Sequence, residues 1–126
     1  MQKIPFTRFI KLLSSHESAR IGRQFIKGPE YEPLDADLGE ALKTAGPLNF
    51  RKLEHTQSNA IRFTGGSWLM FKTPTHVRRK CYAGTFDGSQ YLVSVEYREP
   101  YENDFGRLIA EQNTVLIYQL RPGSGE

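Results

Sequence analysis

The chain has 126 residues, of which 38% are hydrophobic and 12% aromatic, and its formal net charge is +3. This length predicts one domain with its own core, and no apolar run approaches the roughly 20 residues of a membrane-spanning helix. The single cysteine excludes an internal disulfide and a cysteine-rich zinc site. The N-terminus shows no signal peptide, so we expect a cytoplasmic protein without a membrane partner. Residues 1–122 are assigned to one α+β domain and residues 123–126, Gly-Ser-Gly-Glu, to a flexible tail.

The charges are distributed unevenly along the chain. Residues 1–28 carry +5 and residues 29–40 carry −5, whereas residues 41–81 carry +7 and residues 82–105 carry −4. Such segregation favours a bipolar surface, with a basic area that would meet a polyanion or an acidic protein. The alternative is that the blocks neutralise one another in the fold.

The first quarter of the chain predicts a helix over residues 5–27. Pro5 suits its first position, and apolar residues then recur at helical spacing. A capping box at Ser14 and Glu17 would restart or kink this helix, and Gly28-Pro29 would end it. Three cations would share its solvent-exposed face: Arg20, Arg23 and Lys27.

A second helix is predicted near residues 36–45, because Leu38 and Leu42 are four residues apart and would share its buried side. Gly46-Pro47 would end this helix. Its acidic residues are Asp35, Asp37 and Glu40. Acids favour a helix N-terminus because they interact with the helix dipole, and this spacing does not match a calcium-binding loop. We therefore predict no metal site there.

From Leu48 onwards the pattern turns to strands. One strand is predicted within Leu48–Thr56, and Gly65-Gly66 between Ala60–Thr64 and Ser67–Thr73 predicts a tight hairpin. Residues 73–80 end in three adjacent cations. We expect the exposed loop to include these cations, because like charges are costly to bury unpaired.

The longest clean alternation in the sequence is Gln90–Arg98. Apolar or aromatic residues alternate there with polar ones, with Leu92 as the one exception, which is typical of a half-buried strand. Val93 and Val95 are therefore predicted to be core residues. Asp87-Gly88, just before this strand, predicts a hairpin turn because both residues tolerate a positive φ.

A last hairpin is predicted between residues 108–111 and 114–120, with its turn at Gln112-Asn113; the alternative is a short helix over residues 104–111. Helices that precede a run of strands joined by tight turns indicate an α+β fold. We expect N-terminal helices packed on one face of a curled, mainly antiparallel sheet of about five to six strands.

Basic residues interleaved with aromatic ones are the main functional signal. Phosphates attract cations, and unpaired bases stack on aromatic rings. This composition predicts a domain that binds the backbone of RNA or single-stranded DNA. The residues expected to contact nucleic acid are Arg51, Lys52, Arg62, His76, Arg78, Arg79 and Lys80. His55 and His76 are candidates for the base and acid of a ribonuclease-like reaction, because histidine titrates near neutral pH.

A second hypothesis is a non-catalytic inhibitor or adaptor that binds another protein. The segment 99–105 is acidic and aromatic, and its Tyr101 and Phe105 are of the types that anchor protein interfaces. A third hypothesis is a small-molecule pocket in a curled sheet, lined by Trp68, Phe71 and Tyr91. A lone cysteine such as Cys81 indicates a small buried hydrophobic residue rather than a nucleophile. The sequence contains no phosphate-binding glycine loop, nucleophile elbow or zinc spacing, so we predict no metal and no cofactor.

Overall fold

The computed structural model describes residues 1–57, 60–63, 68–70 and 73–122, and within 54–70 it describes the backbone alone. The elements, in chain order, are β1 (Gln2–Ile4), α1 (Phe6–Ser15), β2 (Glu17–Lys27), α2 (Asp35–Thr44), β3 (Arg51–Gln57), β4 (Ala60–Phe63), β5 (Trp68–Met70), β6 (Val77–Phe86), β7 (Ser89–Arg98), β8 (Tyr101–Glu102), β9 (Leu108–Ile109) and β10 (Gln112–Leu120). None of the helices in the described part is long and apolar enough to cross a membrane.

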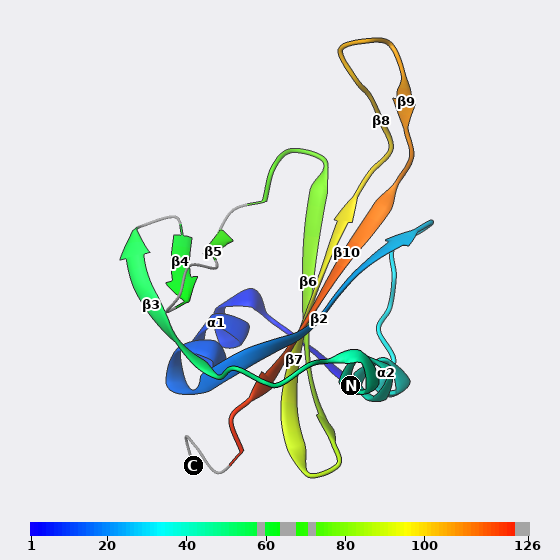
Figure 1. The fold of residues 1–126 in the computed structure, drawn as a ribbon. Helices are drawn as coiled ribbons and strands as arrows, with labels where there is room; N and C mark the ends of the chain where they lie inside the picture. The colour runs from blue at the N-terminus through cyan, green and yellow to red at the C-terminus, as the bar shows by residue number, and fades with distance from the viewer. Residues whose placement is uncertain (58–59, 64–67, 71–72, 123–126) are drawn as a thin grey trace.

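The strands form one curled antiparallel sheet in the order β1-β6-β7-β10-β2-β3-β4-β5, and β8 and β9 form a separate ribbon (Figure 1). The central strands β6, β7, β10 and β2 are long and paired along most of their length, with one register shift between β2 and β10 at Ile117/Tyr118, whereas β3 pairs with β2 through two residues only. The sheet therefore bends where β3 leaves β2. The predicted α+β class with a curled antiparallel sheet is confirmed.

The two helices cover different faces of the sheet, and not one face as the sequence predicted. Helix α1 buries Phe9 and Leu13 in a cluster that includes Leu92 of β7. Helix α2 buries Leu38 and Ala41 in a second cluster that includes Val93, the next residue along the same strand. Successive side chains of a strand point to opposite faces, so β7 is buried on both sides. This double covering explains why Leu92 interrupts the alternation.

The helix predicted over residues 5–27 is only partly correct. Helix α1 ends at Ser15, His16 takes an extended conformation, and residues 17–27 form strand β2. Pairing with β10 along almost the whole of β2 outweighs the approximate helical spacing. Gly22 allows α2 to pack closely against this strand. A Cβ at position 22 would lie only 3.3 Å from the Cβ of Ala41 in α2, so a larger residue would be crowded there.

The turn at Asp87-Gly88 is confirmed, with φ values of 50° and 79° and with Phe86 paired to Ser89. Two other predictions are wrong. The cations of residues 78–80 lie within strand β6 and not in a loop. Strand β6 pairs with β7 from Val77 onwards, so all three cations are part of the sheet. The predicted turn at Gln112-Asn113 is the start of β10, and the ribbon partner of β9 is β8.

Helix α2 coincides with the second predicted helix, and its two leucines differ in burial. Leu38 is fully buried, whereas Leu42 is partly buried at the border of the same cluster. We expect Leu38→Ala to lower the free energy of unfolding by roughly 2–5 kcal/mol, because it removes buried methyl groups and leaves a cavity. Leu42→Ala should cost clearly less. Urea denaturation of both variants tests this, and equal losses would contradict the packing of α2 through Leu38.

Candidate functional site

The three adjacent cations of β6 point to alternate faces of the sheet, and each has an acidic partner. Arg79 lies on the α1 face, where its Nη2 is 2.8 Å and its Nε 3.1 Å from Oε1 of Glu96. Its guanidinium carbon lies 4.6 Å from the centre of the Phe6 ring, and only 7% of its side chain is exposed. Arg79 and Glu96 therefore form a largely buried ion pair on this face of the sheet.

Arg78 and Lys80 lie on the other face, against the segment that follows β2. Lys80 Nζ forms an ion pair with Glu30, and this hydrogen bond raises the pKa of the Lys80 amine. Arg78 lies 3.5 Å from Glu30 and 3.6 Å from Glu99, measured from its Nε and Nη1 to carboxylate oxygens. Acidic residues of segments 29–40 and 82–105 thus pair with cations of the basic segment 41–81. This agrees with the alternative that the charged segments neutralise one another in the fold.

The remaining nucleic-acid candidates are distributed along the sheet. Arg51 and Lys52 begin β3, which is separated from β6 by three strands in the sheet order. His76 immediately precedes β6, and its Nδ1 lies 3.8 Å from Glu99. Arg62 and His55 lie on β4 and β3, and their side chains fall outside the described part of the structure. Sheet order alone therefore does not bring the seven cationic candidates into one cluster.

Of the third hypothesis, a pocket lined by Trp68, Phe71 and Tyr91, the structure describes only the Tyr91 side chain, which borders a cavity of about 450 Å³ beside Gly84 and Leu92. Tyr91 is buried in the core beneath α2, and burial raises the pKa of its phenol. Trp68 and Phe71 belong to the stretch whose side chains are not described. Cys81 is buried beneath α1, and burial raises the pKa of its thiol to about 11, so the thiol is protonated at neutral pH.

Acidic residues near α2 have structural partners. Asp37 Oδ2 accepts hydrogen bonds from the Leu34 backbone N–H and the Tyr31 hydroxyl, both at 2.8 Å, and Glu40 pairs with Lys43 at 3.2 Å. Among the residues that the structure describes, no group of three or more histidine, cysteine or acidic side chains is arranged to hold a metal ion.

A two-stranded arm, residues 99–111, projects from the ends of β7 and β10 (Figure 1). Its base is tied to the sheet: Tyr97 donates a hydrogen bond to Glu111, and Arg98 Nη2 donates to the carbonyl of Ala110 at 2.8 Å. The guanidinium of Arg98 also lies 5.3 Å from the centre of the Tyr101 ring. The arm is therefore a direct extension of two central strands.

The tip of the arm is an ordered turn that presents apolar side chains. Asn103 Oδ1 accepts hydrogen bonds from the backbone N–H groups of Phe105 and Arg107, each at 3.0 Å, and Gly106 takes a φ of 74°. Phe105 is 89% exposed and Leu108 is 78% exposed. Sequence reasoning selected Phe105 but missed Leu108, which was assigned to a hairpin strand with a different partner.

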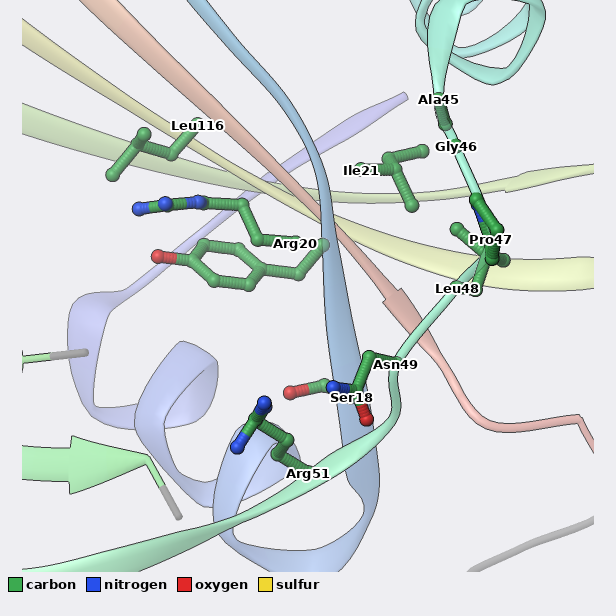
Figure 2. Close-up of a pocket in the computed structure, with 11 residues that line it drawn as sticks. Ser18, Arg20, Ile21, Ala45, Gly46, Pro47, Leu48, Asn49, Arg51 and Leu116 are labelled. Atoms are coloured by element: carbon green, nitrogen blue, oxygen red, sulfur yellow. The ribbon is translucent and has the colours of Figure 1, made fainter. Parts of the chain in front are cut away.

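A pocket with a volume of about 330 Å³ lies between β2 and the segment that joins α2 to β3 (Figure 2). It exists because β3 pairs with β2 at residues 17–18 only, and the preceding segment 45–49 runs apart from the strand. Ser18, Arg20 and Arg51 contribute polar groups to its lining. No local pattern in the sequence indicated this pocket, because it depends on where two distant segments of the chain separate.

No family model matches this chain, and no curated protein or solved structure is significantly similar to it. Its function is therefore inferred from the geometry of the arm and the pocket.

Proposed function

We propose that this chain is a protein-binding module that docks through the tip of the arm. The observation that supports this proposal most directly is the exposure of Phe105 and Leu108, 89% and 78% respectively. Burial of large apolar side chains by a partner lowers the free energy of the complex, because these side chains leave water. Aromatic side chains are also frequent anchors of interfaces. The turn is already ordered by Asn103, so little conformational entropy is lost on binding.

The charges near the tip indicate the chemistry of the partner. Glu102 ends β8, Asp104 lies within the turn, and Arg107 lies between the turn and β9. Glu99 at the base already faces Arg78 and His76. The best complement is an apolar cleft with a basic rim, which would bury the two apolar side chains and offset the carboxylates.

Nucleic-acid binding is the competing hypothesis. A phosphate that approaches Arg78 or Lys80 would compete with the carboxylate of Glu30, and at Arg79 it would compete with Glu96. Each such exchange gives up an existing ion pair, so the gain per phosphate is smaller than at an unpaired cation. These pairs favour the arm over strand β6 as the docking element.

The partner can be captured with a photo-reactive phenylalanine analogue placed at position 105 of the full chain. The matched control carries the same analogue at position 34, because Leu34 is also an exposed apolar residue but lies beside α2. We expect a protein adduct that depends on position 105. Equal adducts from both positions, or an adduct sensitive to ribonuclease, would overturn the proposal and in the second case favour nucleic acid.

Binding of the captured and purified partner should depend on both apolar side chains. We expect the double variant Phe105→Ser with Leu108→Ser to weaken binding by at least about 30-fold, since each lost anchor contributes roughly 1 kcal/mol or more. Leu34→Ser is the control and should bind like the parent. Isothermal titration at several salt concentrations is the measurement. Unchanged affinity of the double variant, or a steep salt dependence of the kind that phosphate contacts produce, would contradict docking through the arm.

A further inference from the structure

The pocket beside β2 is remote from the arm. Ser18 pairs with Leu120 at the C-terminal end of β10, whereas Gln112, at the other end of β10, pairs with Arg98 at the base of the arm. A ligand in this pocket would therefore use a surface that the proposed protein docking does not need.

The register of three strands brings hydroxyl and guanidinium groups to one side of the pocket. Ser18 faces Arg51 across the β2–β3 pair, and Arg20 is two residues along β2 from Ser18. Arg20 in turn faces Tyr118 across the β2–β10 pair. All four residues line the pocket, and Figure 2 shows the side chains of Ser18, Arg20 and Arg51 on the same side of the α2–β3 segment.

The hydroxyl of Ser18 is the least satisfied group in this set. Ser18 is 2% exposed, and its Oγ has no hydrogen-bond partner within the described part of the chain. A buried hydroxyl without a partner costs free energy, which a ligand atom at this position would recover. Arg51 and Tyr118 each have a further interaction within the chain.

The electrostatics of the pocket favour an anion. Its lining contains two arginines and no carboxylate, in the set of described residues. Burial raises the pKa of Tyr118 to about 12, an effect that the Arg20 charge opposes, so the phenol is a neutral donor at physiological pH. Two guanidinium groups and two hydroxyl groups can all donate to an oxyanion, and guanidinium binds carboxylate and phosphate in a bidentate manner.

Apolar residues form the other part of the lining, and they are Ile21, Ala45, Pro47, Leu48 and Leu116. A volume of about 330 Å³ is at the small end of the range for small-molecule sites, roughly 300–1,000 Å³. This combination suits a compact ligand in which an apolar body carries one oxyanion.

We propose that this pocket binds a small organic oxyanion, a carboxylate or a phosphate monoester on a compact apolar body, with the oxyanion held by Ser18, Arg20 and Arg51. This binding is independent of the protein docking proposed for the arm. Loss of one function by mutation should therefore leave the other intact.

The test is a titration of the full chain, labelled with ¹⁵N, with phenylacetate, phenyl phosphate, inorganic phosphate and the neutral 2-phenylethanol. We expect the anionic aromatic probes to shift the backbone resonances of Ser18, Arg20 and Asn49, and the neutral probe to leave them unchanged. The ratio of affinities for phenylacetate and phenyl phosphate identifies which oxyanion the pocket prefers. Absence of site-specific shifts with every anionic probe at millimolar concentration, or equal binding of 2-phenylethanol, would overturn the proposal.

Variants of the full chain then test the assigned residues. Arg20→Gln should lower the affinity for the preferred anionic probe about tenfold or more, because it removes a charge-assisted hydrogen bond. Arg20→Lys keeps the positive charge and should retain part of the affinity. Ser18→Ala should weaken binding severalfold without loss of thermal stability, since it removes an unpartnered hydroxyl. Arg23→Gln is the matched control, because Arg23 is an exposed cation of the same strand that packs over Phe25 outside the pocket. Equal losses for Arg20→Gln and Arg23→Gln would show nonspecific attraction and overturn the site.

Discussion

Val95→Asp is expected to destabilise the domain by roughly 4 kcal/mol or more, which is a large part of the stability of a typical domain. Val95 is 1% exposed and lies in the cluster beneath α2, between Lys80 of β6 and Val115 of β10 in the sheet register. Lys80 already pairs with Glu30, so a carboxylate at this position would be buried without a cation of its own. Urea or guanidinium denaturation measures the loss.

The pH dependence separates charge burial from a mere change of shape. Burial disfavours the ionised form, so the introduced carboxyl should have a folded-state pKa above its ordinary value of about 3.9. The folded state then binds the proton more tightly, and the deficit relative to the parent grows as the pH rises from about 4 through that raised pKa. Gln90→Asp, at an exposed position of the same strand, is the control and should cost little at any pH. A parent-like denaturation midpoint of Val95→Asp would mean that the register of the central sheet is wrong.

The sequence contained enough information for the centre of the fold. The alternation around Val93 and Val95, the Asp87-Gly88 turn and the second helix are local patterns, and each corresponds to an element of the structure. Local patterns succeed there because side-chain period and turn chemistry agree with the tertiary contacts.

The errors have non-local causes. Ile21 and Phe25 are spaced like helical residues, but they lie in β2 because β10, almost a hundred residues later, supplies a complete strand partner. The cations of β6 were expected in a loop because their partners were unknown. Glu30 and Glu96 become their neighbours only through the folded topology.

The two candidate sites differ in how far sequence could predict them. Composition alone selected Tyr101 and Phe105 as interface residues, and the projection of the arm adds Leu108. Ser18 and Arg20 were placed on a helix, so their cross-strand relation to Arg51 and Tyr118 was out of reach. Pocket residues that come from separate strands require the register, and register is a tertiary property.

Asn113→Asp is expected to be the second most damaging change, at roughly 3 kcal/mol or more near neutral pH. Asn113 is fully buried at the start of β10. Its Oδ1 accepts a hydrogen bond from the Tyr31 backbone N–H at 2.8 Å. Its Nδ2 donates to the backbone carbonyls of Pro29, Ile26 and Gly28, at 2.9, 3.2 and 3.4 Å. This one side chain therefore connects the segment after β2 to the sheet.

The substitution keeps the acceptor and replaces the donor by a second oxygen that faces three carbonyl groups. Repulsion and burial should raise the pKa of the introduced carboxyl, because only its protonated form can donate to a carbonyl. The deficit should therefore be smaller near pH 4 than near pH 7, as the linkage between proton binding and stability requires. Asn113→Ala, which loses both roles without adding a charge, should be destabilised to a similar extent at both pH values.

The arm offers a matched control for this experiment. Asn103 Oδ1 accepts hydrogen bonds from two backbone N–H groups, so Asn103→Asp strengthens acceptors already in use and should leave stability unchanged or slightly higher. Hydrogen exchange gives the local readout, because the Tyr31 amide should lose protection in Asn113→Ala and remain protected in Asn103→Asp. The consequence extends to β6: Glu30 belongs to the segment that Asn113 holds, and its ion pairs with Arg78 and Lys80 depend on that placement. If Tyr31 stays protected in Asn113→Ala, this segment is held by other contacts, and the cations of β6 are neutralised independently of Asn113.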